Sequence, residues 1–240
     1  MPEILREHFQ LKETIVTIFA REGRHIDAAK ESIREQRAYL ENFIRKDPFF
    51  QLTLEPYDLV QDDAPHIVKQ MIEKSAVFGI GPMAAVAGAI AGFAVQAMMD
   101  EGATYAMVDN GGDICILNDL PIVVGIYAGS SPIKDLAFQL AARHRPLGIC
   151  TSSGTVGPSI SFGFADAAAV ISPDVALADA AATALGNVVT AEGPLQECFQ
   201  AIDRPGIDGA LVIRGDKMAL WKELPPLRRA RVGAERITKE

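Results

Sequence analysis

The sequence predicts an α+β protein in which long helices surround groups of short strands. Three observations lead to this class. Residues 24–46 have the periodicity of an amphipathic helix, two other segments are rich in Ala and nearly free of charge, and residues 103–129 contain three short β-like runs in succession. Helices and strands therefore do not alternate strictly, and we expect mixed or antiparallel sheets packed with helices. No linker divides the 240 residues, so we expect one domain over residues 1–240.

Five segments are expected to be helical. The first ends at Asp47-Pro48, because proline disfavours the helical conformation of the residue before it. Pro65 and Pro82 each stand where a helix can begin, since the first turn tolerates proline. The expected helices cover residues 24–46, 64–74, 82 to about 100, 175–189 and 194–202.

The expected strands are short runs rich in β-branched and apolar residues, separated by Gly, Asp and Pro. Residues 48–58 are expected to be a strand or a loop. A hairpin is expected over residues 207–221, turning at Gly215-Asp216. The other expected strands lie within residues 10–20, 103–110, 112–119, 121–129, 135–141 and 164–171.

Residues 75–99 contain no charge, and a run of this length can span a bilayer. The run consists mostly of Ala and Gly, Pro82 interrupts it, and neither end carries aromatic residues or a one-sided excess of Lys and Arg. We therefore expect a buried helix whose small residues allow a close approach to a sheet or a ligand.

Charge and cysteine content exclude several classes of protein. A net charge of −8 argues against a nucleic-acid-binding surface, and the basic residues at 227–239 are interpreted as a solvated tail. The three cysteines lack disulfide or zinc spacing, and the N-terminus lacks an apolar signal core, so we expect a cytoplasmic protein outside the membrane. The apolar composition is compatible with a homo-oligomer of unspecified size.

Three glycine-rich stretches are candidates for ligand contact. Residues 79–84, GIGPMA, formally match a dinucleotide fingerprint, but the preceding segment is expected to be a helix instead of the required strand. In VDNGGDI, the pair Gly111-Gly112 is equally compatible with a hairpin turn and with a turn that contacts a ligand. Residues 149–163, ICTSSGTVGPSISFG, are compatible with a turn, a phosphate-binding loop or an activated serine. No histidine or GxSxG motif accompanies these serines, which argues against a serine hydrolase.

Asp179 and Thr183 are four residues apart, so they lie on the same face of the helix expected at 175–189. Carboxylate and hydroxyl oxygens suit Mg²⁺ or Ca²⁺. A polar pair on an Ala-rich helix is costly to bury without a partner, and the alternative is that both side chains face water.

Together, the GGD turn, the TSSG loop and the ADAAATAL helix resemble the ApbE-like superfamily, the flavin transferases once linked to thiamine biosynthesis. The resemblance implies an ApbE-like fold that binds a small molecule, with FAD or FMN and Mg²⁺ as the implied cofactors. It implies Asp179 and Thr183 as metal ligands and two groups of ligand-contacting residues. These are Gly111, Gly112 and Asp113 in the turn, and Thr151, Ser152, Ser153, Gly154 and Thr155 in the loop.

The stretches QLKET, FGIGPMAAVAGAIA and ICTSSGTVG are more closely similar to a bacterial and archaeal branch of that superfamily. That likeness covers nearly the whole chain, and it implies a role in homocysteine biosynthesis, in which sulfide is incorporated into an aspartate-derived intermediate.

The chain departs from the transferases at two places. It has AGAIAG at residues 87–92 where they carry a Lys-Gly-x-x-x-Asp stretch. It has VGPSISFG at 156–163, without a histidine, where they carry a His-x-x-Asp-Pro-x-Thr-Gly stretch. Three hypotheses follow: a ligand-binding protein acting in sulfide incorporation, a Mg²⁺-dependent FAD:protein FMN transferase, and a non-catalytic interaction protein that retains the fold.

Overall fold

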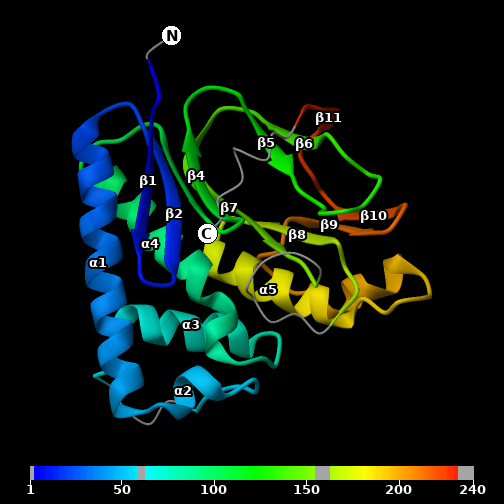
Figure 1. The fold of residues 1–240 in the computed structure, drawn as a ribbon, viewed down its shortest axis with the longest axis horizontal. Helices are drawn as coiled ribbons and strands as arrows, with labels where there is room; N and C mark the ends of the chain where they lie inside the picture. Colours follow the sequence, from blue (N-terminus) through cyan, green and yellow to red (C-terminus); the bar gives the residue numbers. More distant parts are fainter. Residues whose placement is uncertain (1–2, 59–62, 155–162, 232–240) are drawn as a thin grey trace.

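An eight-stranded antiparallel sheet, covered by helices on one face and by a three-stranded sheet on the other, organises the molecule (Figure 1). The structure, a computed structural model, describes residues 3–58, 63–154 and 163–231. The large sheet has the order β1-β2-β3-β4-β7-β8-β9-β10, and the small sheet has the order β11-β6-β5. The expected α+β class with antiparallel sheets is confirmed.

The strands of the large sheet are β1 (Leu5–Leu11), β2 (Thr14–Ala20), β3 (Ala106–Asn110), β4 (Asp113–Asn118), β7 (Arg143–Ser152), β8 (Ala167–Ser172), β9 (Gly209–Arg214) and β10 (Lys217–Lys222). The small sheet contains β5 (Ile122–Ile126), β6 (Leu136–Leu140) and β11 (Leu227–Arg229). The helices are α1 (Gly23–Lys46), α2 (Phe49–Leu52), α3 (His66–Ala76), α4 (Val86–Asp100) and α5 (Val175–Val188), with 3₁₀ helices η1 (Pro82–Ala85) and η2 (Leu195–Ile202).

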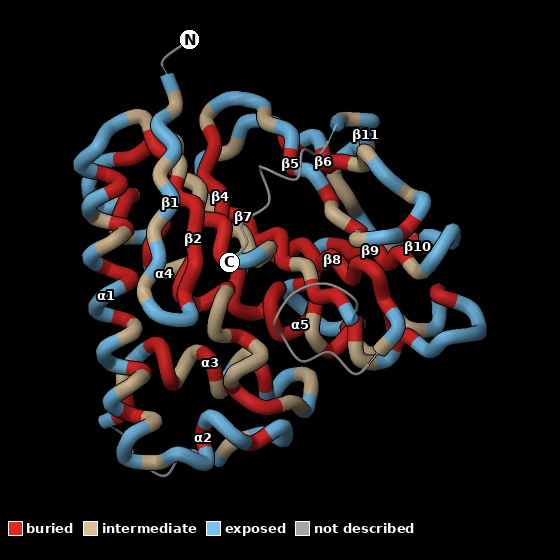
Figure 2. The backbone as a smooth tube through the Cα atoms, viewed as in Figure 1, coloured by how far each residue is buried: buried red, intermediate tan, exposed pale blue. Residues whose placement is uncertain are grey.

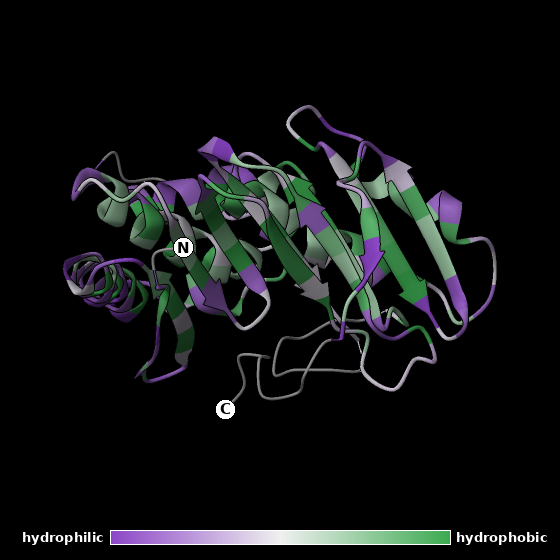
Figure 3. Ribbon diagram, turned by 90° about the horizontal axis from the view of Figure 1, so that it is seen from above, coloured by the Kyte–Doolittle hydropathy of each residue, from purple (hydrophilic) through white to green (hydrophobic). Residues whose placement is uncertain are grey.

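Two apolar cores lie on opposite faces of the large sheet. The larger core fills the space between the sheet and the helices, and the smaller core, with Ile116 and Phe138 fully buried, lies between the two sheets. The buried residues in Figure 2 accordingly concentrate along the central strands, α4 and α5. In Figure 3 the strands are largely hydrophobic, whereas α1 carries both hydrophilic and hydrophobic residues, as its amphipathic sequence predicted.

The helix over Pro82–Asp100 is long and apolar enough to cross a membrane by length and composition alone. In this fold α4 packs between α1 and α5 and against β3 and β4. Its small residues permit that packing: a Cβ on Gly88 would lie 2.5 Å from the carbonyl oxygen of Val175, and a Cβ on Gly92 would lie 2.7 Å from Val175 Cγ1. This packing agrees with the prediction of a buried helix in close contact with its neighbours.

Four local predictions were wrong or incomplete. Residues 10–20 form the end of β1 and all of β2, because the chain turns at Lys12, which has a φ of 54°. Residues 49–52 form the short helix α2, which is anchored by the fully buried ring of Phe50 against Phe43 and Tyr57.

The other two errors concern strands. The start of the Ser/Gly-rich stretch is the end of β7, because residues up to Ser152 pair with β8. Part of the basic segment is also ordered, because Leu227–Arg229 pairs with β6. Both pairings join residues that are distant in sequence, so local composition did not predict them.

Candidate functional site

The β3–β4 hairpin, the end of β7 and the start of β8 meet at one end of the large sheet. Gly111 and Gly112 form the hairpin turn, with φ values of 69° and 106° that favour glycine. The backbone N–H of Gly112 donates a hydrogen bond of 2.9 Å to Asp109 Oδ1. The structure therefore shows the hairpin turn expected of this pair. The sequence-based proposal of ligand contact is compatible with it, since nothing lies within 4 Å of the position of a Cβ on Gly111.

Asp113 and Cys150 are directly opposite each other in the pairing of β4 with β7. Cys150 belongs to the core between the sheet and the helices, and Asp113 lies two residues before the buried Cys115 of the same core. Burial raises the pKa of Asp113 to about 7, and the charge of Asp109 acts in the same direction. Hydrogen bonds from Cys150 and from the backbone N–H of Thr151 favour its carboxylate and oppose that rise.

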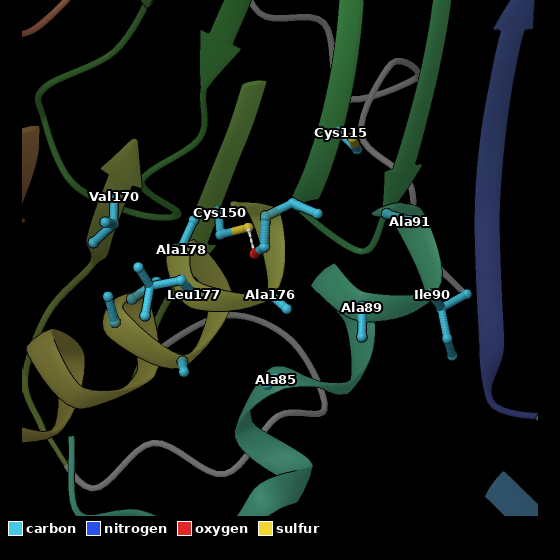
Figure 4. Packing of buried hydrophobic residues seen from close by; sticks show 14 of the residues in the cluster. Ala85, Ala89, Ile90, Ala91, Cys115, Cys150, Val170, Ala176, Leu177 and Ala178 are labelled. Atoms are coloured by element: carbon cyan, nitrogen blue, oxygen red, sulfur yellow. Dashed lines mark hydrogen bonds between the residues drawn. The ribbon is translucent and has the colours of Figure 1, made fainter. Parts of the chain in front are cut away.

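The thiol of Cys150 is fully buried, and its Sγ lies 3.5 Å from the carbonyl oxygen of Val175 at the start of α5 (Figure 4). Burial raises the pKa of Cys150 well above its usual value, and the charges of Asp113 and Asp179 add to the effect. A thiol in this state is a poor nucleophile. Cys150 is therefore a buried thiol that packs in the core and forms hydrogen bonds.

Asp179, on the second turn of α5, contacts the first turn of α4. Its Oδ2 accepts a hydrogen bond of 2.8 Å from the backbone N–H of Gly88, and the Ala87 backbone contributes a second bond. Asn110 at the end of β3 donates to the carbonyl oxygen of Ala87 at 3.1 Å. The start of α4, the end of β3 and α5 are thus joined by polar contacts beneath the hairpin turn.

Burial raises the pKa of Asp179 well above its usual value, and the neighbouring charge of Asp113 raises it further. The backbone N–H groups of α4 oppose this rise because they favour the carboxylate. We use the term acid pair for Asp113 and Asp179. Each member destabilises the ionised form of the other, so a cation at this place would relieve an unfavourable interaction.

Thr183 lies on the same side of α5 as Asp179 and is half-buried. The sequence-based prediction stopped at this pair, but the polar spacing continues to Asn187, which is also half-buried. Asp179, Thr183 and Asn187 are the only residues of α5 other than Ala, Leu, Val and Gly. The i, i+4, i+8 spacing was visible in the sequence and would have indicated Asn187.

The structure does not bring all of the predicted loop residues to the acid pair. Cys150 and Ser152 are turned toward the helices, whereas Thr151 alternates to the opposite face of β7. The hydroxyl of Thr151 is therefore separated from the acid pair, although its backbone N–H reaches Asp113. Ser152 and Ser153 are buried, and Thr155 lies outside the described residues.

Two glycines of this stretch permit close contact between backbone segments. A Cβ on Gly154 would lie 2.1 Å from the carbonyl oxygen of Gly163, and a Cβ on Gly163 would lie 1.9 Å from the carbonyl oxygen of Gly186 in α5. Gly163, at the end of the Ser/Gly-rich stretch, thus packs on α5 at Gly186, and Gly154 packs on Gly163. Part of the glycine content is explained by this packing, independently of any ligand.

The family of the chain follows from comparison with known proteins. The family model described as AbpE bacteria matches residues 2–203. The chain belongs to this family. The UPF0280 protein of Methanothrix thermoacetophila is 61% identical to it over 98% of this chain and all of that relative.

Two solved structures confirm the ApbE-like fold of this AbpE family member. The flavinyl transferase ApbE from Pseudomonas stutzeri, in its apo form, covers 92% of this chain and 96% of its own, with a TM-score of 0.58 at 13% identity. The ApbE protein from Thermotoga maritima covers 99% and 100%, with a TM-score of 0.55 at 14% identity. At these identities the likeness concerns the fold.

The donor set of the AbpE family member fits Mg²⁺ accompanied by a phosphate-bearing ligand. Among the residues that the structure describes, no three His, Cys, Asp or Glu side chains form a group able to hold a metal. Mg²⁺, however, is usually bound by one or two carboxylates together with substrate phosphates. Asp179 and Thr183 supply hard oxygens of the required kind.

The GIGPMA stretch and Asp166 have structural roles. The segment before GIGPMA is helix α3, so the strand required for a dinucleotide fingerprint is missing there. A Cβ on Gly81 would lie 2.1 Å from the carbonyl oxygen of Thr53, which explains that glycine by packing. Asp166, directly before β8, accepts a hydrogen bond of 2.6 Å from the Gly215 backbone N–H in the β9–β10 turn.

Proposed function

We propose that this protein binds a Mg²⁺–nucleotide complex, with FAD or FMN as the first candidates, at the acid pair and the adjoining face of α5. The observation that carries the proposal is the position of two inward carboxyl groups, from β4 and α5, beside the first turn of α4. A pair of acids repels a bare polyphosphate, whereas a bound divalent cation reverses the local charge and attracts it.

In this arrangement the residues of the chain would orient the ligand. Asp179 and Thr183 would hold the metal, which when bound supplies positive charge to the phosphates. The Gly111-Gly112 turn would allow the ligand to approach the backbone, since these positions carry no side chain. The hydrogen bonds from Gly88 and Ala87 would hold the Asp179 carboxylate in place.

The test is FAD binding to the purified protein with and without Mg²⁺, measured by titration calorimetry, with Asp179→Asn beside the natural protein. Asparagine keeps the size and an acceptor oxygen for the N–H of Gly88, so loss of binding in this variant points to loss of the carboxylate as a metal ligand. We expect binding that requires Mg²⁺ and is lost in Asp179→Asn. Binding without Mg²⁺, or unchanged binding in the variant, contradicts the proposal.

Ligand binding is proposed ahead of FMN transfer to a protein. The acid pair is surrounded by carboxyl, thiol and backbone groups, and no Lys or Arg is among the main causes of its pKa shifts. Phosphoryl transfer requires stabilisation of developing charge in addition to a metal. Measuring AMP release from FAD with Mg²⁺ tests this preference for ligand binding over FMN transfer, because sustained release would establish the transferase activity.

The resemblance also motivates a role in homocysteine biosynthesis, which we propose as the process served by the bound ligand. Because the Cys150 thiol is buried and its pKa is raised, sulfide would enter as a free reactant and would not be carried on Cys150. The test is to delete the gene and to express the Cys150→Ser variant in the deletion strain during growth on sulfide.

We expect the deletion strain to require added homocysteine, and we expect the Cys150→Ser variant to restore its growth. A deletion strain that grows without homocysteine contradicts this role, and so does Asp179→Asn restoring growth fully. If a folded Cys150→Ser protein failed to restore growth, the inference that Cys150 does not carry sulfide would be wrong.

A further inference from the structure

The short helix α2 and the residues directly after it expose three large apolar side chains. Phe49 is 62% exposed, Leu52 is 73% exposed and Leu54 is 60% exposed. Figure 1 shows α2 at the outer end of the molecule, below α3, and Figure 2 shows most of this helix exposed. We call Phe49, Leu52 and Leu54 the apolar patch. Contiguous exposed apolar side chains of this size mark interaction surfaces.

The local backbone turns the three side chains of the apolar patch outward. Phe49 and Leu52 are three residues apart, so they share the outer side of α2, whereas the Phe50 ring is fully buried. Thr53 is extended, with φ −67° and ψ 134°, and it is buried. Because neighbouring side chains of an extended segment point to opposite sides, Leu54 faces outward again.

Hydrogen bonds hold this segment in place. The Asp47 carboxylate accepts a hydrogen bond of 3.0 Å from the backbone N–H of Phe49, at the start of α2. The Thr53 hydroxyl accepts from the backbone N–H of Glu55 at 3.1 Å and donates to the Glu55 carbonyl oxygen at 3.0 Å. The apolar patch is therefore presented by an ordered backbone, and binding a partner would cost little conformational entropy there.

A basic residue stands before the apolar patch and an acidic residue stands after it. Lys46, at the end of α1, and Glu55 are both exposed, and neither forms an ion pair with another residue within 3–58, 63–154 or 163–231. A two-fold axis through the patch would reverse the direction of this segment in a second copy. Lys46 of each copy would then face Glu55 of the other, with the two patches in contact at the axis. The charge pattern is thus complementary to itself.

We propose that the apolar patch is the contact surface for a second copy of this chain, in a two-fold symmetric dimer with Lys46 opposite Glu55 at each end. A stable interface involves about 20–30 residues on each partner, more than the patch and the charged residues beside it provide. The dimer is therefore weak, and its population depends on protein concentration. A second copy also suits both charges, whereas a surface of anionic lipid would repel Glu55.

The test measures the dissociation constant of the dimer by sedimentation velocity over a range of protein concentrations. Leu52→Ser should weaken the dimer at least about tenfold, because the substitution removes an apolar contact from both copies. Leu52 is already largely exposed, so its replacement should leave Tm unchanged. Leu220→Ser is the matched control and should leave the dimer unchanged, because Leu220 is also an exposed leucine, at 46%, but lies on β10.

Charge reversal tests whether the two ends of the segment meet. Lys46→Glu and Glu55→Lys should each weaken the dimer about tenfold at low salt, because two like charges then face each other at both ends of the contact. Combining the two substitutions in one chain should restore the natural affinity, because opposite charges face each other again.

Three results overturn the inference: a monomer at every concentration, a dimer that Leu52→Ser leaves unchanged, and a double charge variant no tighter than the single ones. Cosedimentation with vesicles of anionic lipid tests the other occupant. A monomer whose binding to these vesicles is lost in Leu52→Ser would assign the apolar patch to lipid and overturn the inference as well. None of these results affects the proposed function, which Asp179→Asn tests separately.

Discussion

The carboxylate of Asp179 accepts a hydrogen bond of 2.8 Å from the backbone N–H of Gly88, and this contact joins α5 to the first turn of α4. A helix begins with N–H groups that lack partners within the helix, so a buried helix start needs an acceptor from elsewhere. Asp179 supplies that acceptor. The residue expected to bind metal therefore also stabilises the fold, and the two roles must be separated by experiment.

Replacing Asp179 by alanine should lower the free energy of unfolding by about 1–3 kcal/mol, because the N–H of Gly88 loses its buried acceptor. Asp179→Asn keeps an oxygen at the same place and should cost less. Urea unfolding of the two variants without Mg²⁺ measures the difference. Equal losses in both variants would contradict the capping role of Asp179.

Gly88→Ala should destabilise the protein by about 1–3 kcal/mol, the usual range for overpacking a core. The added Cβ would lie 2.5 Å from the carbonyl oxygen of Val175 and 2.7 Å from Asp179 Cβ, so α4 and α5 would have to separate. Gly23→Ala is the matched control, because it is also a helical glycine but has nothing within 4 Å of its Cβ position. Thermal unfolding should show a lower Tm for Gly88→Ala alone.

The raised pKa of Asp113 makes stability depend on pH. Because its folded-state pKa is about 7 and its ordinary value is 3.8, the folded protein binds a proton more tightly than the unfolded chain does. Its contribution is present below pH 4 and is lost as the pH rises toward 7, at about 1.4 kcal/mol per pKa unit. Asp113→Asn should therefore be more stable than the natural protein at pH 8, by urea unfolding without Mg²⁺. The difference should shrink toward pH 4.

Asp119 should show the opposite dependence. The guanidinium of Arg21 lowers the pKa of Asp119 to about 2, so its contribution is present above pH 4 and is lost as the pH falls toward 2. Asp119→Asn should be less stable than the natural protein at pH 7 by about 1 kcal/mol, since the ion pair is partly exposed. Urea titrations at pH 7 and pH 3 test this, and a larger loss at pH 3 would contradict it.

The three cysteines should react with a thiol reagent in two classes. Cys115 and Cys150 are buried, and burial raises the pKa of Cys115 to about 12, so both should be modified only after unfolding. Cys198 is half-buried and should react first in the native protein. Mass spectrometry after brief alkylation identifies the modified site. Rapid modification of Cys150 in the native state would contradict its assignment as a packed thiol.

The sequence by itself determined most of the secondary structure and the polar residues of the site. The helices at 24–46 and 175–189, the hairpin at Gly215-Asp216 and the pair Asp179 and Thr183 follow from local periodicity, turn residues and helical spacing. These properties depend on neighbours within a few positions in the chain, so they can be read without knowing the fold.

Only the tertiary structure decided which side chains meet. The pairing of β4 with β7 brings Asp113 to Cys150 and turns Thr151 to the other face, and the packing of α4 on α5 brings Gly88 to Asp179. Strand register is set by partners distant in sequence, and a shift of one residue would exchange the two faces of a strand. That is why the sequence predicted the chemical groups of the site, whereas the fold determined their arrangement.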